Sequence, residues 1–279
     1  MATTPTTPVT AGRESRSQAP PGFRPAQAGV GRPLPASPRR RTWRPGERAS
    51  RLLAALAAAD IGVHLAVDAW EPPVGSAARR RRDVASRVTQ SLALPLMGAA
   101  WASRPGRRVR GRRAAAVTSA LAWSWVGDTA PALVPGRAAF PVLMASFLPA
   151  QWSWSAAFLP ARRRSALSPS SPAWPLPAVA LVAAATAVGV RLLPGQGALA
   201  PAGALYAASL LTQALLASGA GPQGVAGGAL FVVSDSAIAL GALGGRRLPK
   251  ADLLVMSTYL AAQALLLAAV ERDAGRDPA

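Results

Sequence analysis

The feature that most constrains this chain is an apolar run near its C-terminus that contains a single carboxylate. From Val225 to Leu243 nearly every residue is apolar or small, yet Asp235 lies in the middle of the run. A run of this length is typical of a membrane-spanning helix. A carboxylate in hydrocarbon costs about 2.5–3.5 kcal/mol on insertion scales, so Asp235 is expected to face a protein interior or a wet cavity. We therefore predict that Asp235 belongs to a site.

The composition extends this interpretation to the whole chain. Of the 279 residues 51% are hydrophobic and only 15% are charged, which argues against an ordinary soluble domain. Cysteine is absent and the chain has one histidine, so a disulfide framework and a Cys- or His-rich metal site are both excluded. We expect neither a metal nor a cofactor, and carboxylates and amides remain as the chemical groups of a site.

Apolar segments divide the chain into eight predicted membrane spans. Each is close to the roughly 20 residues that a bilayer core requires. The predicted fold is all-α, a polytopic membrane helical bundle. The spans are expected at about 49–70, 86–102, 114–134, 139–159, 176–193, 199–218, 225–243 and 251–270.

Residues 1–48 are rich in Pro, Arg, Ser and Thr and contain no apolar run, so we expect a disordered tail. The tail lacks the interleaved aromatic residues of single-strand binders. A solvated extension is therefore favoured over a nucleic-acid-binding arm. The membrane domain is expected over residues 49–271, and residues 272–279 form a short C-terminal tail.

Arginines between the apolar segments account for much of the net charge of +19. Basic residues in short loops tend to stay cytoplasmic and so set topology. The segments 104–113 and 162–164 fall on the same side as the basic tail, whereas the run 79–82, expected in a connection, and the group 246–250 fall on the other. This bias predicts a multi-pass protein of the cell membrane with both termini in the cytoplasm.

Polar residues inside the predicted spans indicate where a site lies. Asp128 is a second carboxylate deep in an apolar segment. If the bundle brings it to Asp235, repulsion and desolvation leave one carboxyl protonated and the other ionised, which makes an acid/base pair. In the first span Asp60 and His64 are four residues apart and are expected to pair. Tyr259 and Gln263 share one face of the last span.

Several of these segments resemble the YhhN family, the lysoplasmalogenases. The resemblance covers about residues 50–270, and it implies a membrane hydrolase that cleaves the vinyl ether bond of lysoplasmalogens to a fatty aldehyde and a glycerophospho head group. Its partner is then a lysolipid within the membrane. The matching pairs are Gly127-Asp128, Ala150-Gln151, Ser234-Asp235, Thr258-Tyr259 and Ala262-Gln263.

The resemblance also implies roles for individual residues. Asp128 and Asp235 are the catalytic pair, and no metal is required. The residues expected to bind or orient the substrate are Gln90, Gln151, Trp154, Ser234, Tyr259 and Gln263. The family commonly has Lys at the position of Gln90 and His at that of Gln151, so a catalytically inactive relative stays open as an alternative. A small membrane transporter or lipid-binding protein is the other alternative, and the oligomeric state is left undetermined.

Overall fold

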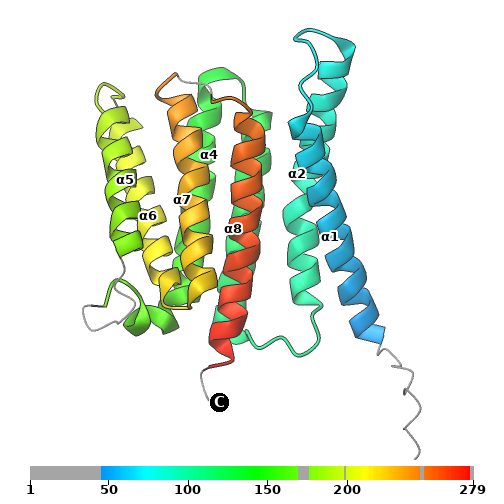
Figure 1. Ribbon diagram of the computed structural model, residues 1–279, viewed down its shortest axis with the longest axis vertical. Helices are drawn as coiled ribbons and strands as arrows, with labels where there is room; N and C mark the ends of the chain where they lie inside the picture. The colour runs from blue at the N-terminus through cyan, green and yellow to red at the C-terminus, as the bar shows by residue number, and fades with distance from the viewer. Residues whose placement is uncertain (1–44, 169–175, 198, 246–247, 277–279) are drawn as a thin grey trace, which may run out of the picture. The chain divides into compact units, whose positions relative to one another are not determined.

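The computed structural model describes residues 45–168, 176–197, 199–245 and 248–276. These residues form eight α-helices joined by turns and short 3-10 helices, and no strand occurs among them, which confirms the predicted all-α fold (Figure 1). The α-helices are α1 (Pro45–Ala69), α2 (Ala77–Ala102), α3 (Gly111–Thr129), α4 (Ala139–Phe158), α5 (Leu176–Leu192), α6 (Leu199–Ser218), α7 (Pro222–Ala242) and α8 (Ala251–Ala274). The 3-10 helices are η1 (Ala130–Leu133), η2 (Gly136–Ala138) and η3 (Leu159–Arg164).

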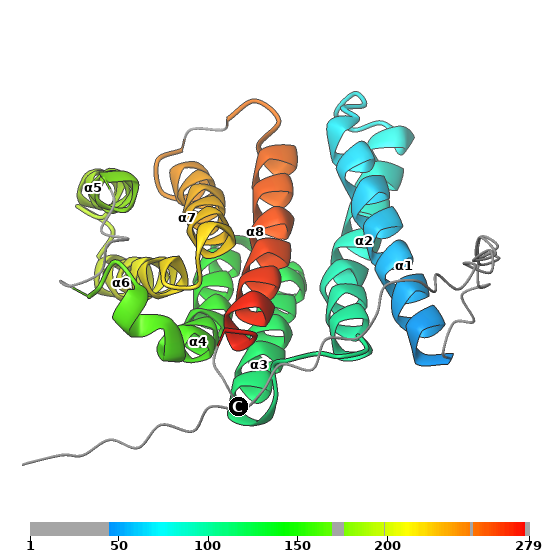
Figure 2. The same ribbon diagram turned by 60° about the horizontal axis from the view of Figure 1, so that its bottom comes forward.

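Consecutive helices run antiparallel, so the start of α1 and the end of α8 lie at the same end of the bundle (Figure 1). Helices α4, α7 and α8 are central in both views, with α5 and α6 beyond α7 on one side and the α1–α2 hairpin beyond α8 on the other (Figure 2). The hairpin packs on the rest through α3 and α8. This arrangement places the polar residues of distant segments around a shared interior.

Four helical segments are long and apolar enough to cross a membrane, namely Gly46–Ala69, Leu199–Ser218, Pro222–Ala242 and Ala251–Ala274. A shorter apolar segment, Val182–Leu192, lies in α5. The remaining helices are less apolar, because α2 and α3 begin with arginines and α4 carries Gln, Ser, Trp and Pro. The chain is a helical membrane bundle, and the crossing of these less apolar helices stays a prediction.

The start of α2 differs most from the sequence prediction. The run Arg79–Arg82 was expected in a connection, but it lies in the first two turns of the helix. Ser76 caps the helix, since its Oγ accepts a hydrogen bond from the Arg79 backbone N–H at 3.0 Å, and such a cap satisfies one of the free donors of the first turn. Arg82 is thereby directed into the protein, where it is buried.

Both ends of the predicted membrane domain also shift. Helix α1 begins at Pro45, so the last residues assigned to the tail are helical, while residues 1–44 lie outside the described part of the chain. Helix α8 extends to Ala274 because its last turn is fixed by ion pairs: Asp273 is fully buried and pairs with Arg113 at 2.7 Å and with Arg164. These contacts join α8 to α3 and η3.

Two glycines of α7 allow it to pack closely against α6. A Cβ added at Gly224 would lie 1.8 Å from the backbone oxygen of Ala217, and one added at Gly228 would lie 2.8 Å from Cα of Ala214. Small residues allow helix backbones to approach this closely. The close contact of α6 with α7 brings side chains from the two helices together at Asp235.

Candidate active site

A cavity of about 480 Å³ with four aspartates in its lining, the polar cavity, lies among α1, α2, α3, α4, α7 and α8. Asp128 and Asp235 both line it, and they are half-buried because the cavity exposes them. Five of the eight predicted site residues meet around this one space: Gln90, Asp128, Ser234, Asp235 and Tyr259. The structure therefore brings the predicted acid/base pair to a shared cavity.

Each aspartate accepts a hydrogen bond from a buried tyrosine. Tyr259 Oη of α8 donates to Asp128 Oδ2 at 3.0 Å, and Tyr206 Oη of α6 donates to Asp235 Oδ2 at 2.5 Å. The chain contains two tyrosines, and both are engaged in this way. A bond from a rigid phenol to one carboxyl oxygen fixes the orientation of the carboxyl group in the cavity wall.

Tyr206 was not among the residues predicted for the site, because the sixth span has few polar features. One signal was available in the sequence. Tyr206 and Gln213 are seven residues apart and therefore share a face of α6, which indicates a polar face within an apolar helix. Nothing in the sequence relates that face to Asp235, which is contributed by a different helix.

An aromatic cluster positions Tyr259. Its ring makes edge-to-face contacts with Phe147 and Phe231, at centroid distances of 5.7 and 5.6 Å, a preferred geometry for aromatic pairs. Phe147 in turn lies directly against Gly127, where an added Cβ would be 2.4 Å from the ring. The glycine that precedes Asp128 is thus required for the close approach of α3 to α4.

Three predicted site residues do not line the polar cavity: Gln151, Trp154 and Gln263. Gln263 is fully buried, donates from Nε2 to Ser124 Oγ at 3.0 Å and accepts from Trp154 Nε1 at 3.2 Å. Gln151 is also fully buried. The roles of these three residues at the substrate stay predictions, and Trp154 and Gln263 are bonded to each other in the packed interior.

A smaller, largely apolar cavity of about 90 Å³ lies among α4, α5, α6 and α7. Tyr206 and Asp235 line it, and it shares Leu143, Asp235 and Ile238 with the polar cavity. Asp235 therefore lies at the border between an apolar and a polar compartment. Two adjacent cavities of this kind suit a molecule that has an apolar chain and a polar head.

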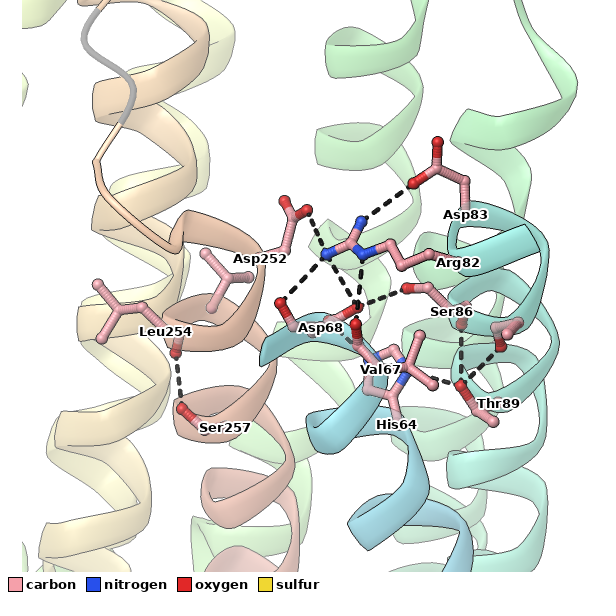
Figure 3. A network of polar contacts seen from close by, with 12 residues as sticks. His64, Val67, Asp68, Arg82, Asp83, Ser86, Thr89, Asp252, Leu254 and Ser257 are labelled. Carbon is pink, nitrogen blue, oxygen red and sulfur yellow. Dashed lines mark hydrogen bonds and ion pairs between the residues drawn. The ribbon is translucent and has the colours of Figure 1, made fainter. Parts of the chain in front are cut away.

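A network of charged residues, drawn in Figure 3, lies beside the polar cavity. Arg82 of α2 donates to Asp252 of α8 at 3.1 Å and lies 3.4 Å from Asp68 of α1. Asp68 also accepts from Ser86 Oγ at 2.7 Å. Because Asp68, Ser86 and Asp252 are cavity-lining residues, this network links the α1–α2 hairpin to α8 beside the site.

The predicted pairing of His64 with Asp60 is wrong. His64 Nε2 lies 3.3 Å from Asp68 Oδ2, and its Nδ1 is 2.7 Å from Thr89 Oγ1. Asp60 and Asp68 are both four residues from His64, so helical spacing alone does not separate them. The tertiary network around Arg82 selects Asp68, whereas Asp60 Oδ2 is buried and has no hydrogen-bond partner within the described part of the chain.

The sequence profile of the YhhN family matches residues 86–270. The chain belongs to the YhhN family. The matched range includes both aspartates, both tyrosines and all the predicted site residues, while α1 and Arg82 precede it. No curated protein matches the chain, and no solved structure does.

Proposed function

We propose that this YhhN protein hydrolyses the vinyl ether bond of a lysoplasmalogen within the membrane. The observation that carries the proposal is the meeting of Asp128 and Asp235 in one polar cavity, each with a tyrosine bonded to it. Vinyl ether hydrolysis needs a proton donor and a group that activates water, and two carboxyls in different protonation states supply both. Either aspartate is suited to the role of the acid.

The reaction begins with transfer of a proton from one carboxylic acid to the vinyl carbon that is not bonded to oxygen. The resulting oxocarbenium ion is stabilised by the other carboxylate, which takes a proton from water as that water adds to the oxygen-bearing carbon. The product is a hemiacetal, which collapses to a fatty aldehyde and the free hydroxyl of the glycerophospho head group. One water molecule is consumed, and the proton returns from the base to the acid before the next turnover.

The two compartments around Asp235 support this assignment. The apolar cavity among α4, α5, α6 and α7 suits the start of the alkenyl chain, and the polar cavity suits the glycerol and head group. In that pose the vinyl ether lies at the border, beside Asp235.

The test is aldehyde release from a lysoplasmalogen by the purified protein in detergent. Asp128→Asn and Asp235→Asn keep the size of the side chain but remove the acid, and each is expected to lower turnover by about 10²–10⁴-fold, the range for general acid–base catalysis. Glu71→Gln is the control, because Glu71 is exposed just beyond the end of α1 and does not line the cavity. A folded parent protein without turnover would refute the proposal.

Proton-coupled transport is a second candidate function. The observation that favours it is the charge of the cavity lining. Four aspartates line the cavity, and no lysine or arginine lines it among the described residues. Purified protein in liposomes would then dissipate a pH gradient, and the aspartate variants would not. Gradient decay without aldehyde release would replace the hydrolase with the transporter.

An inactive relative is the third reading, and it is motivated by Gln90 and Gln151. The combined variant Gln90→Lys with Gln151→His tests it in the aldehyde assay. A large gain over an inactive parent would mean that this chain has lost the activity. An active parent that the double change does not improve would exclude that reading.

A further inference from the structure

Another large cavity, of about 560 Å³, lies at the end of the bundle where α1 begins and α8 ends (Figure 1). It is lined by α1, α2 and α8 and by the first residues after α2. Ala54 of α1 and Ala264 of α8 line it and are exposed. The cavity is therefore a groove that opens outward between the α1–α2 hairpin and α8, and we call it the hairpin groove. None of its described lining residues lines the polar cavity.

Polar and apolar residues line the hairpin groove at different depths. Ser50 and Arg51, near the start of α1, and Arg104, just after α2, lie toward the end of the bundle. Met97 and Leu267 line the groove farther in and are buried. At 1.5 Å per residue along a helix, Met97 lies about 10 Å inward from the level of Arg104. The groove therefore has a polar entrance and an apolar interior.

The entrance of the groove has an excess of positive charge. Arg51 and Arg104 are both exposed, and Glu47 is the one acid that lines the groove among the described residues. A cleft lined mainly by charges of one sign concentrates ligands of the opposite sign. Anions are therefore attracted to the entrance.

Trp101 forms part of the wall near the entrance. Its Nε1 donates to Glu271 Oε1 of α8 at 2.8 Å, and Glu271 also accepts from the Arg108 backbone N–H at 3.0 Å. The guanidinium carbon of Arg107 lies 4.6 Å from the centre of the Trp101 ring, which brings another cation beside the entrance. Tryptophan is enriched at the level of lipid head groups in membrane proteins, so the entrance matches that level.

We propose that the hairpin groove binds a membrane phospholipid with an anionic head group. The phosphate lies at Arg51 and Arg104, since guanidinium groups bind phosphate through paired, charge-assisted hydrogen bonds. The first part of an acyl chain lies inward along Met97 and Leu267. Basic pockets between membrane helices are suited to anionic head groups, and the apolar interior adds the requirement for a lipid.

Two other occupants fit the groove less well. Residues 1–44 include eight arginines and one acid, so the chain's own N-terminal segment has the same sign of charge as the entrance. A soluble anion pairs with the arginines but leaves the apolar interior in contact with water. A phospholipid satisfies both parts of the groove.

A lipid in the groove is expected to stabilise the protein, because it contacts the hairpin and α8 at once. A ligand that binds only the folded state raises stability by mass action. The test is therefore thermal unfolding of the full chain in a neutral detergent, with phosphatidylglycerol or phosphatidylcholine of the same acyl chains added. Phosphatidylglycerol at about 100 times its Kd is expected to raise Tm by about 5–10 °C, and phosphatidylcholine by much less. This experiment does not depend on turnover.

Three variants locate the effect. The double variant Arg51→Gln with Arg104→Gln is expected to abolish the difference between the two lipids. Its matched control is Arg81→Gln with Arg87→Gln, which removes the same charge from exposed positions of α2 outside the groove and is expected to keep the difference. Ala264→Phe fills the apolar part without a change of charge and is expected to reduce the gain in Tm from phosphatidylglycerol.

Equal gains in Tm from the two lipids, or no gain from either, would overturn the proposal. An equal gain from inorganic phosphate would replace the lipid with a soluble anion. Light scattering addresses a second copy of the chain as the occupant: a dimer that forms without lipid and that the Arg51→Gln, Arg104→Gln variant dissociates would also overturn the proposal. A lipid difference that the Arg81→Gln, Arg87→Gln variant abolishes as well would mean that overall charge, and not this groove, attracts the lipid.

Discussion

Replacement of Gly127 by alanine is expected to destabilise the protein, because the new side chain would clash with one aromatic ring. The added Cβ would lie 2.4 Å from the Phe147 ring, whereas ordinary contacts begin near 3.4 Å, so the ring has to retreat by about 1 Å (3.4 − 2.4). The ring is confined by edge contacts with Phe231 and Tyr259. Overpacking of this kind costs about 1–3 kcal/mol, which exceeds the gain of up to about 1 kcal/mol that alanine brings over glycine in a helix.

The assay is thermal unfolding in detergent, followed by tryptophan fluorescence, for the four proteins of a double-mutant cycle with Phe147→Leu. In the parent background Gly127→Ala is expected to lower Tm by about 2–4 °C per kcal/mol of net destabilisation. In the Phe147→Leu background the clash is gone, so the same change is expected to be neutral or stabilising. Equal effects of Gly127→Ala in both backgrounds would refute the claim that Phe147 is what the glycine accommodates.

Three further changes probe other parts of the structure. Tyr206→Phe removes the hydrogen bond to the Asp235 carboxyl, and a bond of this kind is worth about 1.5–3 kcal/mol. The value of kcat/KM for aldehyde release is therefore expected to fall about 10- to 150-fold. A fall below threefold would mean that the phenol does not orient Asp235. Asp273→Asn leaves Arg113 without its buried counter-charge and is expected to cost about 3–5 kcal/mol, measured as a lower Tm; an unchanged Tm would contradict the assignment. Arg82→Gln releases α2 from α8 and is expected to speed amide hydrogen exchange in the first turns of α2, whereas unaltered exchange would show that apolar packing alone fixes the hairpin.

Most of the fold follows from local features of the sequence. The starts of α4, α5, α6 and α8 coincide with those predicted, because Pro, Gly or charged residues interrupt each apolar run just before the helix begins. The start of α2 was misplaced because a run of arginines is typical of a loop, while the burial of Arg82 depends on acids from α1 and α8. That information is tertiary and does not appear in the run itself.

The candidate site was predictable to the extent that its residues are costly in hydrocarbon. Asp128 and Asp235 stood out for that reason, and both line the cavity. Tyr206 is an inexpensive residue in a membrane helix, and its shared face with Gln213 gave no indication of the hydrogen bond that it donates to Asp235. Likewise, Asp60 and Asp68 lie at equal helical spacing from His64. His64 pairs with Asp68, which is held in place by Arg82 from another helix.

The ion pairs of Asp273 bear on how the protein is made. Arg113 and Arg164 precede Asp273 by more than a hundred residues, so during synthesis both arginines emerge long before the carboxylate that neutralises them. Until α8 is inserted, the end of the bundle formed by α3 and η3 carries this positive charge without its partner. A chain truncated before Ala251, which lacks α8 and with it Asp273, is therefore expected to insert its first seven helices and to stay open at that end.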